Sequence, residues 1–234
     1  MGRHRVHDDA TAAALLDAAE RILEGDGVAG LTVRRVADGV GVSTRAVYST
    51  MGSKDGLLQE LGVRAFDTLG AMVEALPSTS DPAADLVSAG VQGFRAFALD
   101  HPALFRIGIQ LTDAPAAARP HIRAAADRAL SNLLERLERL RAAGGLDRRP
   151  PLVAATQFHA TCEGLAALEL RGALAHTTNP VDIWVGGLSA LITGWHPGPD
   201  RPLSPPTDAR HDRSHFGPER TAIDSGTHLS GTGA

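Results

Sequence analysis

A single arginine stands among hydroxyl side chains in the run STRAVYS, residues 43–49. If this run is helical, Ser43, Thr44, Arg45 and Tyr48 share its outward side. An arginine in this setting can donate two hydrogen bonds to the O6 and N7 atoms of guanine, and hydroxyl groups can reach bases or phosphates. These residue types at this spacing therefore indicate DNA recognition.

Two short helices joined by a glycine-containing turn are predicted to position these side chains. Apolar residues recur at helical spacing from Val33 to Val40, and Thr32 precedes them as an N-cap residue. Residues 39–41, Gly-Val-Gly, end this helix, and Ser43 caps the next one. The arrangement is typical of a helix-turn-helix, whose second helix enters the major groove of DNA.

A longer helix follows at once, with Ser53 as its N-cap and Lys54 and Asp55 in its first turn. The carboxylate of Asp55 suits the positive end of a helix dipole, whereas the ammonium group of Lys54 does not. We interpret Lys54 as a partner for an external anion such as a DNA phosphate.

The run from Leu15 to Leu61 strongly resembles the N-terminal DNA-binding region of the tetracycline-repressor-like (TetR) family of transcription regulators. Its ordered elements LTVR, VA, GVS, AVY, GSK and LL carry the resemblance, although Met51 stands where such sequences usually have Phe. The resemblance implies DNA contacts from Thr32, Arg34, Ser43, Thr44, Arg45, Tyr48 and Lys54, and we add Arg35 and Ser49 as candidates.

The net charge of -4 and the pI near 6.2 argue against indiscriminate nucleic-acid binding. Residues 1–60 are themselves slightly acidic, with seven Lys or Arg against nine Asp or Glu. The local balance differs, and only the local face touches phosphate. Residues 31–55 carry four cations against Asp38 and Asp55, namely Arg34, Arg35, Arg45 and Lys54.

The remainder of the chain favours an all-α fold of about nine helices, because apolar residues keep recurring three and four positions apart. Further helices are predicted near 10–24, 53–76, 81–100, 116–143, 150–171 and 180–195, with a short apolar one after His101-Pro102. We expect a flexible arm over 1–9, a helix-turn-helix DNA-binding domain over 10–55, a helical ligand-binding and dimerisation domain over 56–196, and a disordered tail over 197–234.

Most of the aromatic residues of the chain lie from Phe94 onward, in the region that we expect to act as a ligand sensor. From His101, the run HPALFRIGIQ resembles the start of one TetR ligand-domain type, the WHG type. The later run FHATCEGLAALEL has Glu163-Gly164 where that type has His-Gly. Core packing or a ligand pocket accounts for the aromatics, which we name as ligand-binding candidates: Phe94, Phe97, Phe105, Phe158 and Trp184.

His159 and Glu163 share one face of an apolar helix, where ionisable groups need partners or a wet cavity. They can pair with each other or with an arginine, line a ligand pocket, or bind a metal, and two ligands are too few for a structural zinc site. We add both to the ligand-binding candidates. No metal site, catalytic site or cofactor is predicted.

The helices near 150–171 and 180–195 are rich in Ala, Leu and Gly on more than one face, so each needs packing partners on two sides. One side can meet the subunit's own core, and the other can meet a second copy across a two-fold axis. We expect a homodimer through these helices. The alternative is a monomer that buries both sides internally.

The sequence predicts a ligand-responsive transcription regulator, most simply a repressor released from an inverted-repeat operator on double-stranded DNA by a small, mainly apolar effector. The lone Cys162 and the lack of an apolar segment of membrane-spanning length favour a cytoplasmic protein without a membrane partner. Two other classes stay open: an architectural DNA-binding protein, and a helical enzyme using His159, Glu163 and Cys162. No Ser/His/Asp spacing, phosphate loop or metal motif supports the enzyme.

Overall fold

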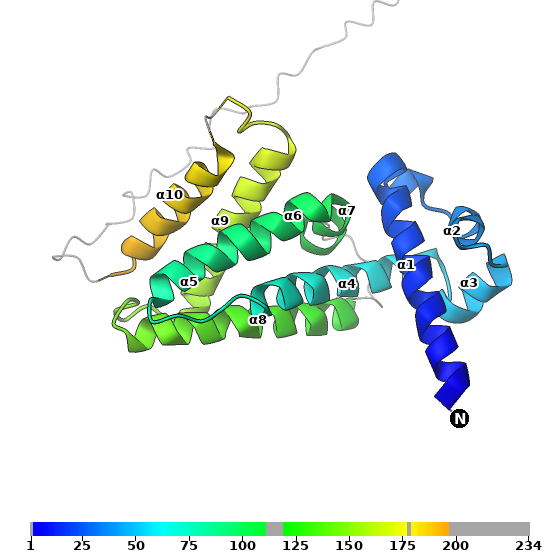
Figure 1. Cartoon of the computed structure of the whole chain (residues 1–234), viewed down its shortest axis with the longest axis horizontal. Helices are drawn as coiled ribbons and strands as arrows, with labels where there is room; N and C mark the ends of the chain where they lie inside the picture. The colour runs from blue at the N-terminus through cyan, green and yellow to red at the C-terminus, as the bar shows by residue number, and fades with distance from the viewer. Residues whose placement is uncertain (1, 111–118, 177–178, 197–234) are drawn as a thin grey trace, which may run out of the picture. The chain divides into compact units, whose positions relative to one another are not determined.

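Three helices, α1 (Gly2–Gly30), α2 (Val33–Val40) and α3 (Thr44–Met51), form an N-terminal group that we call the head (Figure 1). Helix α1 begins at Gly2, so residues 2–9 continue this helix instead of forming the predicted arm. No proline interrupts this stretch, and its Arg, His and Asp residues are compatible with a helix. The backbone of α1 leaves helical geometry at Gly27, where φ is 65° and ψ is -170°, a conformation that glycine adopts without steric cost.

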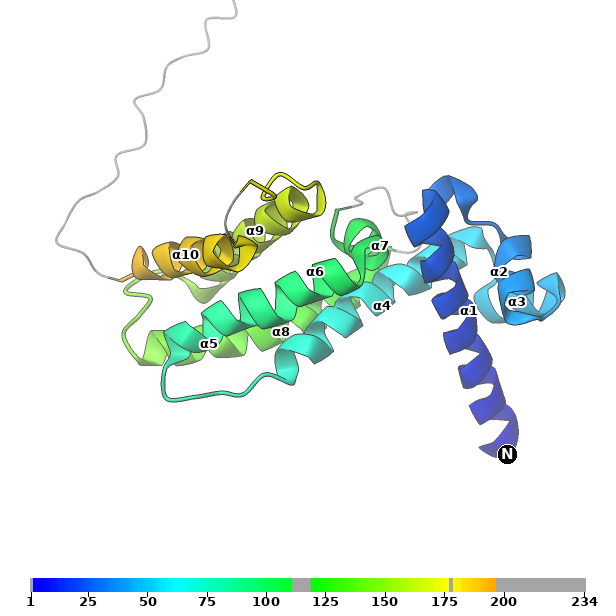
Figure 2. The ribbon, with the colours of Figure 1, turned by 45° about the horizontal axis from the view of Figure 1, so that its top comes forward.

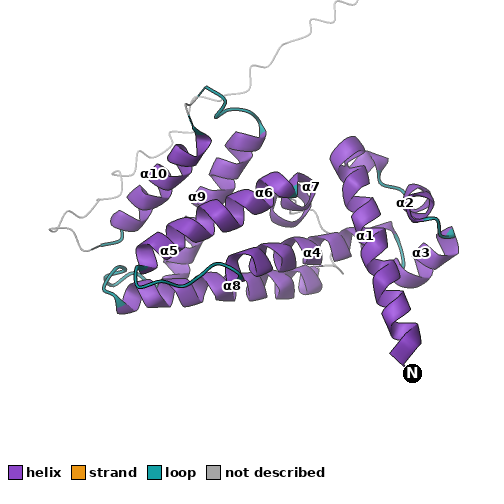
Figure 3. Cartoon of the chain, viewed as in Figure 1, coloured by secondary structure: helices purple, strands orange, loops and turns teal. Residues whose placement is uncertain are grey.

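The computed structural model describes residues 2–110, 119–176 and 179–196. Within these ranges every regular element is a helix, so the predicted all-α fold is confirmed (Figure 3). None of the described helices is long and apolar enough to cross a membrane. The predicted tail, 197–234, lies outside the described residues.

The elements after the head form what we call the body. They are α4 (Lys54–Glu74), α5 (Pro82–Ser88), η1 (Ala89–Arg95), α6 (Ala96–Asp100), α7 (Pro102–Leu104), η2 (Phe105–Gln110), α8 (Arg119–Ala142), α9 (Pro151–Leu170) and α10 (Pro180–Thr193). Helices α4 and α8 lie side by side (Figures 1 and 2). Glycine permits their close approach, because a Cβ atom on Gly62 would lie 2.9 Å from Cδ1 of Ile122.

The buried Arg136 of α8 closes the C-terminal end of α4. Its Nη2 atom donates hydrogen bonds to the carbonyl oxygens of Val73, at 2.8 Å, and of Leu76, at 2.9 Å. A cation at this end of a helix also interacts favourably with the helix dipole. Arg136 thereby joins α8 to the last turn of α4.

The segments η1 and η2 are wound as π-helix. The single helix predicted near 81–100 is therefore a continuous rod with a wider turn at η1. Asp81 is its N-cap, since the carboxylate accepts hydrogen bonds from the backbone N–H groups of Ala83 and Ala84. Glycines make room for that turn: a Cβ atom on Gly90 would lie 2.3 Å from Cδ1 of Leu188, and one on Gly93 would lie 2.7 Å from Cγ2 of Val73. The bare backbone of η1 thus contacts both α10 and α4.

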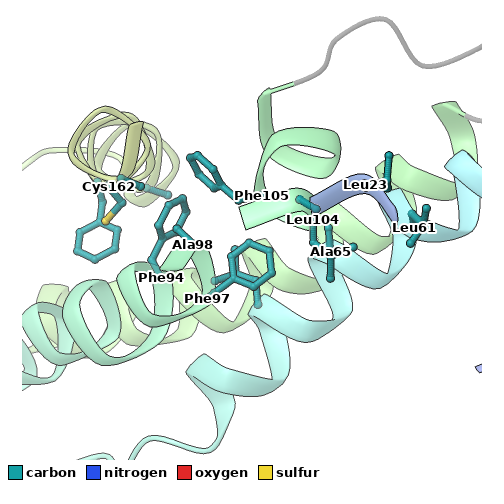
Figure 4. Close-up of a cluster of buried hydrophobic side chains, with 14 of the residues drawn as sticks. Leu23, Leu61, Ala65, Phe94, Phe97, Ala98, Leu104, Phe105 and Cys162 are labelled. Carbon is teal, nitrogen blue, oxygen red and sulfur yellow. The ribbon is translucent and has the colours of Figure 1, made fainter. Parts of the chain in front are cut away.

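Buried apolar side chains join the head to the body without interruption. Figure 4 shows them running from Leu23 and Leu61, where α1 meets α4, past Phe97 and Phe105 to Cys162 on α9. Each of these five side chains is at most 3% exposed. Because protein interiors are close-packed, a shift of the residues on one side of this core also displaces the residues that pack against them.

Glu169 of α9 holds α10 and η1 together. Its carboxylate accepts hydrogen bonds from Nε of Arg95 at 2.9 Å, from Nη2 of Arg95 at 2.6 Å and from Nε1 of Trp184 at 2.8 Å. Bidentate arginine–carboxylate pairs are among the stronger polar contacts in proteins. The sequence did not predict this contact, because its members lie far apart along the chain.

Asp85 ties the α4–α5 loop to α8. Its buried carboxylate accepts hydrogen bonds from the backbone N–H of Thr79 at 2.8 Å, from the hydroxyl of Thr79 at 2.7 Å and from Nη1 of Arg139 at 2.7 Å. Burial raises the pKa of Asp85, but the hydrogen bonds and the charge of Arg139 outweigh burial and hold the pKa below its ordinary value.

We expect Asp85→Asn to lower the free energy of unfolding by roughly 2–4 kcal/mol at pH 7, because it breaks a buried, fully bonded charge pair. A depressed carboxyl pKa stabilises the fold above about pH 4, and this contribution is lost as the pH falls through the lowered pKa. Urea unfolding at pH 7 and at steps into acid should therefore show wild type and variant converging.

The control for this experiment is Asp67→Asn, because Asp67 pairs with Arg128 at 2.7 Å in an ion pair about half exposed on each side. Such a surface pair contributes under about 1 kcal/mol. Equal losses of stability in the two variants would contradict the assignment of Asp85.

Candidate functional site

Hydroxyl caps and a glycine turn set the geometry of α2 and α3. The Oγ1 atom of Thr32 accepts a hydrogen bond from the backbone N–H of Arg35 at 3.3 Å, and Oγ of Ser43 accepts one from Ala46 at 3.2 Å. Both predicted N-caps are thus confirmed. Between the helices, Gly41 takes a left-handed conformation with φ 75° and ψ 28°, which turns the chain sharply. The pair forms a helix-turn-helix.

The outward side of α3 presents Thr44, Arg45 and Tyr48 to solvent, with Tyr48 55% exposed. Arg45 makes no hydrogen bond or ion pair to any described residue, so all its donors are open to an external acceptor. The hydroxyl of Ser49 donates to the carbonyl oxygen of Ala46 at 2.9 Å, which leaves it as an acceptor. The individual DNA contacts of these residues stay predictions.

Two of the four cations predicted for the basic face lie on α2 and are paired within the head. Nε of Arg34 lies 4.0 Å from Oδ2 of Asp38, and both side chains are well exposed. Nη1 of Arg35 donates to the carbonyl oxygen of Gly30 at 3.0 Å, and its Nη2 pairs with Asp26. Arg35 therefore joins α2 to the end of α1, a role that the sequence did not predict because Asp26 lies nine residues earlier in the chain.

Lys54 also has an internal acceptor. Its Nζ atom donates to the carbonyl oxygen of Val28 at 3.1 Å, one residue beyond the kink at Gly27. This contact links α4 to α1, and the interpretation of Lys54 as a partner for a DNA phosphate stays a prediction. An ammonium group has three donors, so two N–H groups remain for a phosphate. Of the four cations, Arg45 alone has no partner among the described residues.

A buried carboxylate, Glu20 of α1, connects the head to the body. Its Oε1 lies 2.8 Å from Nδ1 of His101, in the turn between α6 and α7, and its Oε2 lies 3.7 Å from Nε of Arg64 on α4. Nη2 of Arg64 also donates to Oδ1 of Asp17 at 2.5 Å. The sequence predicted His101 only as a helix break, and this tertiary contact carries no local signal.

A cavity of about 340 Å³ lies between α4, η1, α8 and α9. Its α4 wall is formed by Phe66, Leu69, Gly70 and Val73, and its α8 wall by Ala126, Ala129, Leu130 and Leu133. An engineered cavity of about 150 Å³ binds benzene, so this one has room for a ligand on the order of twice that size. Sequence reasoning missed these walls because their residues are ordinary helix-core types.

The structure divides the predicted ligand-binding residues into two sets. Phe94, Phe158 and His159 line the cavity. Phe97, Phe105 and Trp184 are fully buried and do not line it, which matches the alternative of core packing. Phe105 nevertheless supports the cavity wall, since its ring meets that of Phe94 edge to face at a centroid distance of 6.1 Å.

His159, which lines the cavity, forms an i, i+4 pair with Glu163, which does not line it. Nε2 of His159 lies 3.6 Å from Oε2 of Glu163, and the two side chains are 42% and 36% exposed. Burial lowers the pKa of His159, and the charge of Glu163, which raises it, does not compensate. His159 is therefore neutral at pH 7. Among the described residues, no group of three His, Cys, Asp or Glu side chains is placed to hold a metal ion.

Cys162 lies one turn along α9 from Phe158 and is fully buried. Burial raises the pKa of its thiol far above the usual range, so the reactive thiolate is not populated near neutral pH. Cys162 thus packs as a small apolar side chain, and the enzymatic alternative loses its proposed nucleophile.

Two family comparisons cover most of the described chain. Residues 15–61 match the family described as bacterial regulatory proteins, tetR family. Residues 87–191 match the family described as tetracyclin repressor-like, C-terminal domain. Comparison with curated proteins finds no match.

Solved structures share the fold over nearly their whole length. A protein of unknown function from Rhodococcus sp. RHA1 is 27% identical with a TM-score of 0.70, and the match covers 80% of this chain and 96% of that one. The putative regulatory protein SCO4313 is 23% identical, with a TM-score of 0.65 and coverage of 82% and 98%. PfmR from Thermus thermophilus, described as a TetR family transcriptional regulator, is 19% identical, with a TM-score of 0.61 and coverage of 76% and 96%.

The capping contact of Ser43 predicts that Ser43→Ala lowers the free energy of unfolding by about 1 kcal/mol, because the N-terminal N–H groups of α3 lose their acceptor. Urea unfolding followed by circular dichroism measures this loss. The adjacent Thr44→Ala is the matched control and should change stability by under about 0.5 kcal/mol, since Thr44 is exposed. A larger loss for Thr44→Ala than for Ser43→Ala would refute the cap assignment.

Proposed function

The chain belongs to the TetR family of ligand-responsive DNA-binding transcription regulators, and we propose that it is a homodimeric repressor of this family. In this proposal the dimer binds an inverted-repeat operator through its two heads. A small, mainly apolar effector in the cavity between α4, η1, α8 and α9 releases it.

The observation that carries the proposal is that one helix, α4, belongs to both sites. Its first residue, Lys54, follows α3 by a short turn and bonds to the end of α1. Several turns further on, Phe66, Leu69 and Val73 form a wall of the cavity. A ligand that displaces this wall must displace the N-terminal half of α4 or bend the helix, and either change acts on the head.

The contacts between α1 and α4 support transmission of that movement to the whole head. Arg64 of α4 is bonded to Asp17 and lies close to Glu20, while Lys54 holds Val28 at the other end of the contact. α1 therefore follows α4, and α2 and α3 pack on α1. Release requires a difference in operator affinity between the two states of about 1–3 kcal/mol, a typical allosteric coupling.

The outward face of α9 and α10 supports dimerisation. Ala160 and Gly164 of α9 are exposed, as are Ile183 and Gly186 of α10. A Cβ atom on Gly164 or Gly186 would meet no other atom within 4 Å, so this face has no partner in the described part of the subunit. Small and apolar side chains on two neighbouring helices suit a self-complementary interface across a two-fold axis.

Selection of bound fragments from source genomic DNA by the purified protein, at two salt concentrations, tests the function. We expect a short inverted repeat whose half-sites lie about one helical turn, or roughly 34–36 Å, apart. Recovery of unrelated sequences that wash off at moderate salt would refute a sequence-specific regulator and favour an architectural role.

Arg45→Ala is expected to relax the preference at one base pair of each half-site and to weaken binding by about 1–3 kcal/mol, because a bidentate contact to guanine is lost. Its stability should not change, since Arg45 has no partner among the described residues. Repeating the selection with the variant measures the preference. An unchanged consensus sequence would rule out Arg45 as a base reader.

Lys54→Ala should weaken binding to all sequences alike and reduce the salt slope of log K by about 1, as loss of one phosphate contact does. Because Lys54 also bonds to Val28, this variant should lose stability as well. Fluorescence anisotropy over a salt series measures the slope. An unchanged slope with reduced stability would assign Lys54 to the fold alone.

Ala160→Glu should convert the dimer to a monomer, because it places a charge in the centre of the face where two copies of α9 would meet. Light scattering measures the molar mass, which should fall to that of a monomer. The affinity for the operator should fall as well. Ala124→Glu makes the same change at an exposed position of α8 and is the control. A dimeric Ala160→Glu protein would exclude this interface.

A further inference from the structure

A buried cation beside the cavity has no anionic partner within the described part of the subunit. Arg136 of α8 is 6% exposed, and no carboxylate of the described residues lies within ion-pair distance of it. Neighbouring arginines are each paired with a carboxylate: Arg95 with Glu169, Arg128 with Asp67 and Arg139 with Asp85. A buried charge without a counter-charge is strongly unfavourable, so Arg136 differs from its neighbours in a way that needs a physical cause.

The guanidinium group of Arg136 also keeps an unused donor. Its Nη2 atom donates to the carbonyl oxygens of Val73 and Leu76, but its Nη1 atom is buried and has no hydrogen-bond partner. The C-terminal end of α4 carries only about half a negative charge, so it compensates the cation in part. A water molecule on Nη1 would satisfy the donor alone, whereas an anion would satisfy both the donor and the charge.

This guanidinium group lies next to one end of the cavity between α4, η1, α8 and α9. Its acceptor Val73 lines the cavity, and so does Leu133, which precedes Arg136 by one turn of α8. The cavity walls are otherwise apolar, apart from Thr156 and His159 of α9. An apolar space of about 340 Å³ therefore ends beside a cation that lacks an anion.

We propose that the cavity binds an apolar monocarboxylic acid whose carboxylate accepts a hydrogen bond from Nη1 of Arg136. This inference rests on the proposed function, since it names the chemical class of the effector. The apolar part of the acid lies between α4, α8 and α9. Arg136 stands behind the half-buried side chains of Val73 and Leu133, and the carboxylate reaches it when one of them changes rotamer.

The same contact connects the ligand to the helix that belongs to both sites. Arg136 holds the last turn of α4 through the carbonyl oxygens of Val73 and Leu76. Hydrogen bonds between two charged groups are stronger than those to a neutral carbonyl oxygen, so a carboxylate on Nη1 competes with these contacts for the guanidinium group. Binding of the acid thereby loosens the end of α4, whose other end bonds to the head through Lys54.

Three probes of similar shape with different polar ends test the inference: 4-phenylbutanoic acid, 4-phenylbutanamide and 4-phenylbutylamine. Isothermal titration calorimetry at pH 7.5 with the full-length protein measures their affinities. We expect the acid to bind at least about tenfold more tightly than the neutral amide, with the amine weakest, a difference of about 1.4 kcal/mol per tenfold. An amide that binds as tightly as the acid, or binding of none of the three, overturns the inference.

The protonation state of the bound acid gives a second test on the wild-type protein. Pairing with a guanidinium group lowers the pKa of a carboxyl group, whereas an apolar site without a cation raises it. NMR of the acid labelled with ¹³C at its carboxyl carbon, titrated from pH 7.5 to pH 5, reports this pKa in the free and bound states. A lower pKa in the bound state is expected, and a higher one overturns the contact with Arg136.

Arg136→Met removes the charge and the donors but keeps a long apolar side chain. The acid should lose at least about tenfold in affinity, while the amide changes by less than about twofold and so reports an intact cavity. Arg128→Met is the matched control, since Arg128 is an exposed arginine of the same helix and does not line the cavity. Equal acid affinity in wild type and Arg136→Met overturns the role of Arg136.

Arg136→Lys is the second variant, because Arg136 also holds the end of α4 and its loss can destabilise the fold. Lysine keeps the positive charge, so this variant should still prefer the acid to the amide. Loss of that preference in a variant that binds the amide as wild type does contradicts a charge-based contact. If Arg136→Met does not fold, Arg136→Lys and the NMR titration decide the question.

Operator release is measured separately by fluorescence anisotropy with each probe. If the acid binds in the expected order but leaves operator affinity unchanged, the ligand class stands and the proposed release mechanism fails. If the amine alone releases the operator, the repressor function stands and the inferred ligand class fails.

Discussion

The buried carboxylate of Glu20 is the constraint on which the arrangement of head and body depends. Only 10% of its side chain is exposed, and a charge removed from water to that extent is tolerated only where partners surround it. Its partners, Arg64 and His101, come from α4 and from the turn before α7. The fold must bring these three segments together, and the apolar core around Leu23 and Leu61 closes over the same junction.

Local chemistry made much of this fold predictable. Thr32, Ser43 and Ser53 were identified as caps from residue type and position, and each accepts the expected hydrogen bond. Gly41 was assigned to the turn because glycine takes left-handed backbone conformations readily. Such signals lie within a few residues of the structure they specify, so a single sequence is enough to find them.

Contacts between distant residues were not predictable in the same way. Arg35 donates a hydrogen bond to the carboxylate of Asp26, and Lys54 donates one to the carbonyl oxygen of Val28. Two cations expected on the DNA face therefore also stabilise the head. The cavity was only partly predicted: aromatic residues were named, yet its α4 and α8 walls are mainly aliphatic and indistinguishable from ordinary core. His159 was found because an ionisable residue on an apolar helix is conspicuous, whereas Phe97 and Trp184 proved to be core.

The wide turn of η1 determines the direction in which the side chains of the following helix, α6, point, because η1 and α6 are one continuous rod. An α-helix advances about 100° per residue, so one residue more or fewer in this segment turns the next helix by that angle. Phe97, which packs into the core, and His101, which meets Glu20, both follow η1 closely in the chain. Loss of a single residue from η1 would face both away from α1 and α4. The number of residues in η1 is therefore as important to the position of the head as any side chain that touches it.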